Sequence, residues 1–490
     1  MKIYRLYTLL AAAVMSLSAC DSFLDMQPTN ASNAETAIAT TDDAQVAING
    51  IMRAMSSSSY YGRNFMLYGD AKGGDLTIYS AGRGMDALYS FNHAPTSGSY
   101  SGYWSTGYYC IMQVNNLIEN IDRLQAAGQT GFDNYKGQAL TLRALFYFDL
   151  VRLYGLPYNY DKTALGVPNV IQTLEASAQP TRATVEENYA QILADLKAGA
   201  ELLADNKKPV DSYVGYFANI ALQARVNLYM ERYAEALAAA KEIIDSKKYS
   251  LYAPDDDWVD SWRKQYASES ILELGIDTES DLGSSSLGFY YMQYGRKKNA
   301  MGWFLASDYF LNRLGEDPDD VRWGVMDVDE EDYDFETGRR GACYKYMGSV
   351  DMVGDGKETS TAVNIKLIRL SEIYLIAAEA ALQTGDKEAA ASYLNAIRQR
   401  APHLEPATAA TVSLDMILDE RSKELFGEGH RFFDMIRCNR SIEYNDDFQS
   451  VPISQREKVI DRTFYKIVLP ISQDELNANP ALRSQQNPGY

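Results

Sequence analysis

Residues 414–437 predict two helices joined by a tight turn, and this local arrangement limits the folds that the chain can adopt. The segment reads LDMILDERSKELFGEGHRFFDMIR, and Ser413 stands just before it. A serine there can accept a hydrogen bond from a free amide at the helix start. Apolar residues recur at helical spacing in the first helix: Leu414, Ile417, Leu418 and Leu425. Gly427 and Gly429 end that helix, so two helices are expected to pack closely at this point.

The same segment is crowded with charged side chains. They are Glu420, Arg421, Glu424, Glu428, His430, Arg431, Asp434 and Arg437. Such a group is either a catalytic cluster or a paired polar network that fixes the angle between two helices. Charges of opposite sign three and four residues apart usually pair with each other, which favours the paired network.

Helical periodicity recurs along most of the chain. It predicts helices over 41–55, 108–124, 135–154, 185–203 and 213–230. Ala224 and Ala236 are twelve residues apart, as are Ala378 and Ala390, which is the small-residue spacing of a tetratricopeptide repeat. The predicted fold class is therefore mostly α, a tetratricopeptide-like helical repeat scaffold.

Two stretches lack this periodicity. Residues 56–104 are dense in glycine, serine and tyrosine, and we expect loops there. Residues 253–361 contain tryptophans and a strongly acidic run at 327–336, and predict a long, irregular, loop-rich insertion. Long loops inside a compact protein are often functional.

Composition argues against several classes of chemistry. The chain of 490 residues carries a net charge of −20, which disfavours binding to nucleic acid. Its three histidines are not spaced as ligands of a zinc enzyme, and no nucleotide-binding fingerprint stands in a strand–turn–helix context. The acidic run lacks the central glycine of an EF-hand and is interpreted as a solvated loop. We expect no metal and no cofactor.

The N-terminus predicts export and lipid anchoring. Residues 1–19 combine Lys2 and Arg5 with a short apolar run that is too short to span a membrane. The run ends in Leu-Ser-Ala before Cys20, which is the pattern that a lipoprotein signal peptidase requires. Cys20 is therefore the predicted lipidation site, and acyl chains give a stable anchor without a spanning helix. The other cysteines, Cys110, Cys343 and Cys438, are expected mostly as buried free thiols.

Four stretches together resemble one known family. They are CDSFLD at 20–25, RALFYFDLV at 143–151, ERSKELFGEGHRFFDMIR at 420–437 and LPISQDELNANPALRSQQNPGY at 469–490. Their order and spacing are similar to those of the SusD/RagB family of nutrient-binding outer-membrane lipoproteins. The resemblance extends over nearly the whole chain.

This resemblance implies a division of the chain and a role for it. After the signal peptide (1–19) come a lipidated tether (20–40), an N-terminal helical part (41–252), the loop-rich insertion with the ligand-site candidate (253–361) and a C-terminal helical-repeat part (362–490). The family implies a partner, a SusC-like TonB-dependent transporter, and a lipid anchor in the outer membrane. It also implies that the protein faces outward.

Tyrosine and tryptophan rings can stack on sugar rings, while acidic, amide and guanidinium groups bond to hydroxyls. Two loop regions concentrate these residue types. The predicted ligand-binding residues are Tyr61, Arg63, Asp75, Tyr79 and Arg83 in the first, and Tyr290, Tyr291 and Trp303 in the second. The alternative for each is ordinary loop packing.

Three hypotheses about function follow. The first is a non-catalytic glycan-binding lipoprotein that delivers oligosaccharide to the transporter, with peptide cargo, as in RagB-like members, as its main variant. The second is a lipid-anchored glycoside hydrolase, because such enzymes need only two carboxylates. The third is a helical-repeat scaffold that binds only proteins.

Overall fold

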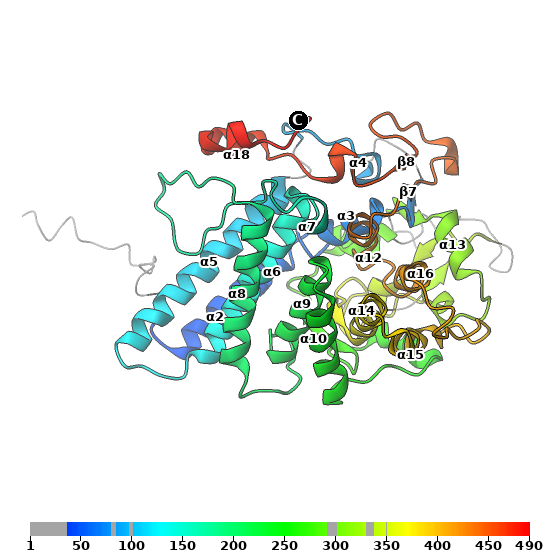
Figure 1. Cartoon of the computed structure of the whole chain (residues 1–490), viewed down its shortest axis with the longest axis horizontal. Helices are drawn as coiled ribbons and strands as arrows, with labels where there is room; N and C mark the ends of the chain where they lie inside the picture. The colour runs from blue at the N-terminus through cyan, green and yellow to red at the C-terminus, as the bar shows by residue number, and fades with distance from the viewer. Residues whose placement is uncertain (1–36, 80–84, 98–100, 292–300, 330–337, 349) are drawn as a thin grey trace, which may run out of the picture.

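The computed structural model describes residues 37–79, 85–97, 101–291, 301–329, 338–348 and 350–490. Helices dominate this part of the chain (Figure 1). The long ones are α2 (Thr41–Met55), α5 (Ser101–Ala126), α6 (Asp133–Tyr154), α8 (Val185–Leu203), α9 (Tyr216–Tyr229), α10 (Tyr233–Ser246), α14 (Leu370–Gln383), α15 (Lys387–Arg398) and α16 (Leu414–Glu424). The predicted fold class, mostly α, is confirmed. Within the described residues, no helix has the length and apolar character needed to cross a bilayer.

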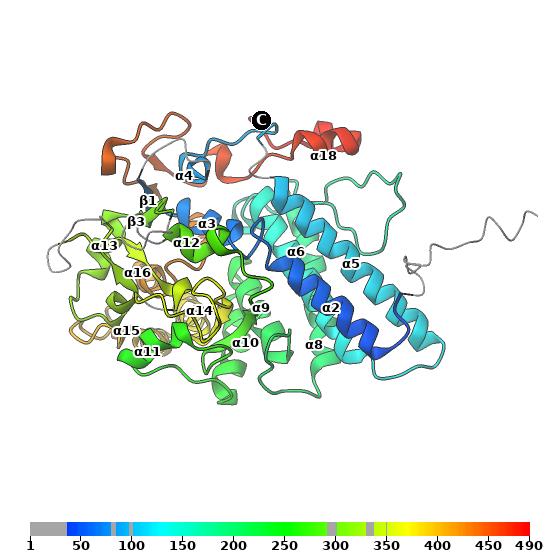
Figure 2. The same cartoon turned by 180° about the vertical axis from the view of Figure 1, so that it is seen from behind.

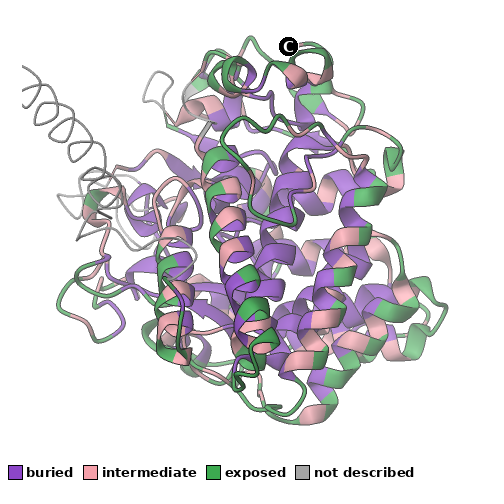
Figure 3. Ribbon diagram, turned by 90° about the vertical axis from the view of Figure 1, so that its left-hand side faces the viewer, coloured by how far each residue is buried: buried purple, intermediate pink, exposed green. Residues whose placement is uncertain are grey.

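The long helices stack one after another. Successive neighbours pack together from α5 and α6 through α8, α9 and α10 to α14 and α15. In Figure 1 the stack runs from α5 at the left to α14 and α15 at the right, and in Figure 3 the exposed positions lie on the outer sides of the helices. Almost all of α6 from Gly137 to Tyr154 is buried, so this helix lies in the middle of the stack.

Small residues allow the closest helix contacts. Ala224, Ala236, Ala378 and Ala390 are all fully buried, and they lie in the hairpins α9–α10 and α14–α15. The two hairpins touch through α10 and α14. The helices therefore lie where the repeat predicted them, while the assignment of a tetratricopeptide repeat to them stays a prediction.

The loop prediction for 56–104 is wrong in part. That region contains α3 (Asn64–Ala71), α4 (Asp86–Ser90) and the start of α5, which begins at Ser101. Seven of the eight residues of α3 are buried, so the helix has no exposed face and no amphipathic period that a sequence could show.

Among the described residues the remaining helices are short, and the strands form four small antiparallel sheets. The helices are α7 (Tyr158–Asp161), α11 (Asp256–Asp260), α12 (Leu287–Tyr291), α13 (Asp308–Leu314), α17 (Arg431–Arg437) and α18 (Gln473–Ala478). The strand pairs are β1 (Leu76–Ile78) with β3 (Phe304–Ala306), β2 (Ser270–Leu274) with β6 (Ile365–Arg369), β4 (Met326–Asp327) with β5 (Ala342–Cys343), and β7 (Ile442–Glu443) with β8 (Val459–Ile460). The first two pairs bring the insertion region against parts of the chain outside it, and the third joins two strands within it.

The acidic run at 327–336 is described only at its start. Asp327 and Asp329 are 3% and 5% exposed, so the expected solvated loop is wrong at these positions. Arg339 forms an ion pair with Asp329, which explains how that carboxylate is accommodated inside. The remaining residues, 330–337, lie outside the described part of the chain. Cys110, Cys343 and Cys438 are free thiols, as expected.

Candidate ligand site

The charged residues between α16 and α17 lie inside the protein. None of the eight is more than 9% exposed. Arg369, at the end of β6, reaches Glu428 through two bonds of 2.7 and 2.8 Å and Glu424 through one of 3.0 Å. Arg322 donates to Glu420 at 2.6 Å. The prediction of a paired network is therefore confirmed. We call the eight charged residues of this segment the charged turn.

The charged turn has no group prepared to exchange protons near neutral pH. Burial by itself raises the pKa of Glu424, but the guanidinium groups of Arg400, Arg369 and Arg322 lower it to about 2. Burial lowers the pKa of His430 to about 4, against the opposing effect of Glu372. These carboxylates stay ionised and the imidazole stays neutral, which suits a structural role.

A second group of side chains meets at the surface instead. Arg63, just before α3, donates from Nη1 to the hydroxyl of Tyr290 at 3.0 Å, and its guanidinium carbon lies 4.6 Å from the centre of the Tyr290 ring. The rings of Tyr290 and Trp303 meet edge to face with centroids 5.1 Å apart. The pairing of β1 with β3 ends at Ile78 and Phe304, and Tyr79 and Trp303 are the next residues along the two strands. We call these four residues the aromatic cluster.

The aromatic cluster combines packed and accessible surface. Tyr79 is 43% exposed, Arg63 and Trp303 are half-buried, and Tyr290 is 6% exposed. Its elements α3, α12, β1 and β3 gather at one corner of the molecule (Figure 2). Three of the eight predicted binding residues, Arg63, Tyr290 and Trp303, are thus linked by contacts between segments that are far apart in the chain, and Tyr79 directly follows β1, the strand that pairs with β3.

Two tyrosines and an aspartate hold the loop that carries Arg63. The hydroxyls of Tyr60 and Tyr61 both donate to Oδ2 of Asp149 at 2.6 Å, and Arg152 donates to Oδ1 of Asp149 at 2.6 Å. Asp149 lies on α6, at the centre of the stack. Tyr61 was predicted to bind ligand, but it is 4% exposed and its hydroxyl is used internally, so its place is behind the aromatic cluster.

Two further predicted residues also face the interior. Asp75 is 2% exposed, forms an ion pair with Arg313 and accepts a hydrogen bond from Ser422 at 2.6 Å. Tyr291 is 1% exposed and donates to Oδ2 of Asp70 at 2.9 Å. The right residue types were identified, but the polar atoms of these two side chains already have partners inside the protein.

Asp70 is a residue that the sequence did not single out. Its Oδ2 accepts from Tyr291 and from the amide of Gly429 at 3.0 Å, and so ties α3 to α12 and to the charged turn. Burial raises the pKa of the Asp70 carboxyl to about 8, although both hydrogen bonds act in the opposite direction. The backbone of α3 also approaches closely: a Cβ on Gly69 would lie 2.0 Å from the carbonyl oxygen of Gly429. Only the folded arrangement reveals this contact.

Two predicted residues, Arg83 and Cys20, lie outside the described part of the chain. Their roles as ligand contact and lipidation site stay predictions.

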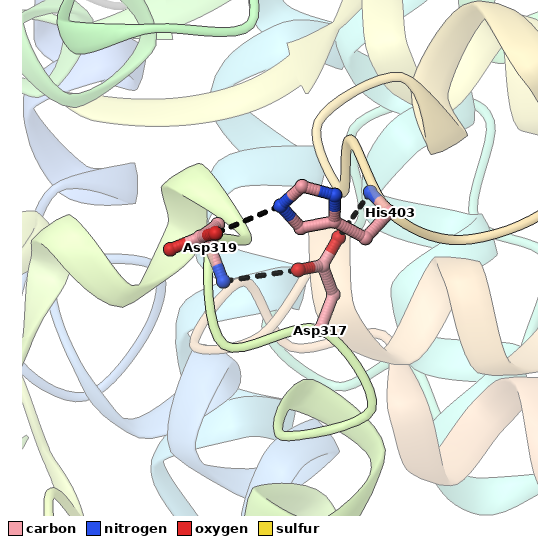
Figure 4. A group of neighbouring side chains, drawn as sticks. All are labelled: Asp317, Asp319 and His403. Carbon is pink, nitrogen blue, oxygen red and sulfur yellow. Dashed lines mark hydrogen bonds and ion pairs between the residues drawn. The ribbon is translucent and has the colours of Figure 1, made fainter.

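One group of possible metal ligands occurs within the described residues. Asp317, Asp319 and His403 offer ligand atoms within 4.8 Å of one another (Figure 4). Both oxygens of Asp317 already accept backbone amides, from Asp319 at 3.0 Å and from His403 at 2.7 Å. The imidazole Nε2 lies 2.8 Å from Oδ2 of Asp319. These bonds join two surface loops and account for the group without an ion.

Comparisons with known proteins agree along the chain. Residues 22–228 match the family described as "Starch-binding associating with outer membrane", and residues 287–490 match the SusD family. A SusD-like protein of Formosa agariphila is 24% identical over 476 residues, covering 87% of this chain and 90% of the relative.

Solved structures extend the comparison. A SusD superfamily protein of Bacteroides thetaiotaomicron is 32% identical, with a TM-score of 0.81, and covers 92% of this chain and 100% of its own. A protein of Bacteroides vulgatus, provisionally named a sugar-binding protein, is 34% identical with a TM-score of 0.81 and coverages of 93% and 100%. On these matches, together with the shared helical fold, the chain belongs to the SusD/RagB family.

Proposed function

We propose that this protein binds oligosaccharide at the aromatic cluster and passes it, unchanged, to a SusC-like TonB-dependent transporter. The observation that carries the proposal is the meeting of Arg63, Tyr290 and Trp303, with Tyr79 beside them, at an accessible corner. Ring faces and edges there can pack on the C–H faces of sugars, while the guanidinium bonds to hydroxyls.

The likeness to known proteins supports sugar as the ligand class. The structural relative from Bacteroides vulgatus carries a sugar-binding name, and the family matched by residues 22–228 carries starch in its description. The family description also associates its members with the outer membrane, which fits an anchor at Cys20. We propose that the lipidated protein faces outward and covers the transporter.

The carboxylates beneath the aromatic cluster favour binding over hydrolysis. A glycoside hydrolase needs two carboxyl groups that flank the scissile bond. Asp70, Asp75 and Asp149 are each at most 2% exposed and bonded to neighbouring side chains. A sugar resting on the aromatic cluster would not reach them.

Affinity electrophoresis against starch, laminarin and a wider glycan panel tests the ligand class, with a peptide pool as the competing ligand. We expect Trp303→Ala to weaken binding of the retained glycan at least tenfold. An aromatic contact at the centre of a site often contributes about 2 kcal/mol or more, which is a factor of about 30 in affinity. Trp323→Ala is the matched control, since Trp323 is also half-buried but lies in another part of the fold.

Three outcomes would overturn parts of this proposal. If peptides but no glycan are retained, the ligand class is peptide. If new reducing ends are released from a bound glycan, the protein is a hydrolase. Equal affinity of Trp303→Ala and Trp323→Ala would remove the aromatic cluster as the site.

The lipid anchor needs its own test. Cys20→Ser is expected to move the protein from the membrane fraction to the soluble one, and unchanged membrane association would contradict lipidation.

A further inference from the structure

A polar cavity lies beside the aromatic cluster and is not part of it. Its volume is about 410 Å³, within the range of small-molecule sites. Its walls come from the second half of α2, from the turn before α9 and from the segments next to β2 and β6. The side chains of interest are Asn49, Arg53, Tyr213, Gln265, Tyr266 and Asn364. We call this space the tyrosine cavity.

The tyrosine cavity has hydrogen-bonding capacity to spare. Among the described residues, the Tyr213 hydroxyl has no partner, and Asn49 uses only its Oδ1, which accepts from Gln45 at 3.0 Å. Arg53 uses one N–H, to the carbonyl of Glu279 at 3.2 Å. Tyrosine rings beside unused amide, hydroxyl and guanidinium groups form the mixture that a sugar chain needs.

The ligand class of the tyrosine cavity follows from its charges. Lys357 is at the wall, but its ammonium group is already bonded to Asp355 at 2.8 Å, to the carbonyl of Ala362 at 3.0 Å and to Asn364 at 2.6 Å. The remaining cation, Arg53, lies close enough to Asp277 to lower the pKa of that carboxyl, after the larger effect of the Ser280 hydrogen bonds. Local charge is thus balanced, which favours a neutral, hydroxyl-rich ligand over an anion.

The backbone at the wall is also unusual. Ser212 and Tyr266 have φ angles of +65° and +47°, a region that residues other than glycine seldom adopt. Such conformations persist where the surrounding structure holds them, and they concentrate at binding sites. Both residues line the tyrosine cavity.

Two chain segments run from the tyrosine cavity to the aromatic cluster. One leads from Ser56 in the cavity wall to Arg63, and the other leads from Ile276 to Tyr290. They are tied together at both ends, by Arg53 to the carbonyl of Glu279 and by Arg63 to the carbonyl of Ser285, each at 3.2 Å. Arg63 is seven positions after Ser56, so even a fully extended chain between them would span at most about 25 Å.

A small void of about 10 Å³, with room for no more than one water molecule, shares Ile276 with the tyrosine cavity. It is also lined by Gly62 and Ser286, which are close in sequence to Arg63 and Tyr290. The Ser286 side chain is 6% exposed, and its hydroxyl has no hydrogen-bond partner in the described part of the chain. A buried hydroxyl without a partner is costly unless a ligand or water supplies one.

We propose that the tyrosine cavity is a second subsite, which binds further units of the oligosaccharide held at the aromatic cluster. This inference rests on the proposed function and adds to it a preference for chain length. A ligand long enough to reach both places gains the second set of contacts without a second association step.

Calorimetric titration with sugars of two lengths tests the second subsite. The probes form two series, maltose with maltooctaose and laminaribiose with laminarioctaose, and the series that binds is the binding series. We expect the eight-unit sugar of the binding series to bind about tenfold more tightly than the two-unit sugar in the unmodified protein. Asn49→Ala and Tyr213→Ala are expected to remove most of that difference and to leave the affinity for the two-unit sugar unchanged.

Two controls separate this effect from general damage. Gln45→Ala removes the hydrogen bond to Asn49 from the same helix without touching the cavity wall, and Tyr109→Ala removes a tyrosine that is 56% exposed on α5. Both are expected to keep the length preference. A crystal structure with the eight-unit sugar should show density in the tyrosine cavity.

The outcomes distinguish the two proposals. Equal affinity for both lengths, or a length preference that survives Asn49→Ala and Tyr213→Ala, overturns the second subsite while binding at the aromatic cluster stands. If neither series binds at any length and the wider glycan panel is also negative, the proposed function fails and the second subsite fails with it.

Discussion

The charged turn and the aromatic cluster both contact α3 or the residue before it, and they use polar groups in opposite ways. In the charged turn, arginines and carboxylates satisfy one another, as when Arg369 joins Glu424 and Glu428. In the aromatic cluster, Arg63 donates to the amide oxygen of Asn64, the hydroxyl of Tyr290 and the carbonyl of Ser285, yet it is only half-buried. The charged turn stands out in the sequence by its many charged residues, yet it is closed to solvent. Its charges pair with one another because a buried charge has to be neutralised by a neighbour.

The first prediction breaks the closed region. Arg369→Met is expected to lower the free energy of unfolding by about 3–5 kcal/mol, because it leaves buried carboxylates without their cation. Urea unfolding measures this change. Arg232→Met is the control, since Arg232 and its partner Glu235 are 43% and 50% exposed, and a change within about 0.5 kcal/mol is expected there. Similar effects of the two variants would mean that the charged turn contributes little to stability.

The second prediction concerns a buried cation outside the charged turn. Lys72 is fully buried, its Nζ has no hydrogen-bond partner within the described residues, and it lies 3.9 Å from the centre of the Phe91 ring. We expect Lys72→Met to raise the free energy of unfolding by about 1–3 kcal/mol, the cost of burying an unpaired polar group.

The pH dependence gives a second measure of Lys72. Burial lowers its pKa well below 10.5, so folding releases a proton, and stability rises with pH towards 10.5. Thermal unfolding of the unmodified protein and of Lys72→Met at several pH values should show the gap between them shrink as the pH approaches that value. A destabilised Lys72→Met would indicate that the surrounding rings bind the ammonium form favourably.

The third prediction tests the link between the two regions. Asp70 has a raised pKa, so its carboxyl favours the folded state below 3.8, and this contribution is lost as the pH rises through about 8. Asp70→Asn keeps an oxygen for Tyr291 and Gly429 and removes the ionisation. Its Tm should match that of the unmodified protein at low pH and exceed it by about 2–4 °C at pH 8. A constant gap across this range would contradict the raised pKa.

The fourth prediction has the smallest effect. Arg63→Lys keeps the positive charge but loses the planar group that lies over Tyr290. We expect affinity for the bound glycan to fall about threefold and the free energy of unfolding to change by less than about 0.5 kcal/mol. Calorimetric titration and urea unfolding measure the two. A large loss of stability would show that the aromatic cluster is part of the packed interior.

Strong helical patterns were predictable, and buried helices were not. The helices at 41–55 and 185–203 have clear apolar stripes and capping residues, and the structure places them at the predicted bounds. By contrast, α3 is buried on nearly every side and shows no period. The start of α5 is rich in glycine, serine and tyrosine, which resembles a loop in the sequence.

The candidate site was predictable in kind and not in orientation. Tyr290 and Tyr291 are neighbours of the same type, yet only Tyr290 contacts Trp303, while Tyr291 points to Asp70. Consecutive residues of α12 point in different directions. The packing beneath the helix therefore decides which tyrosine contacts Trp303 and which contacts Asp70. The three-residue pairing of β1 with β3, which ends next to Tyr79 and Trp303, is also too short to recognise in a sequence.

The aromatic cluster joins Arg63 to Tyr290, which are 227 positions apart. A contact between such distant residues forms late, because closing a long stretch of chain costs entropy before it brings any gain. While the protein is being synthesised, the helices around α6 can assemble long before this corner exists. We therefore expect the protein to bind its ligand only after the second half of the chain has folded onto the first.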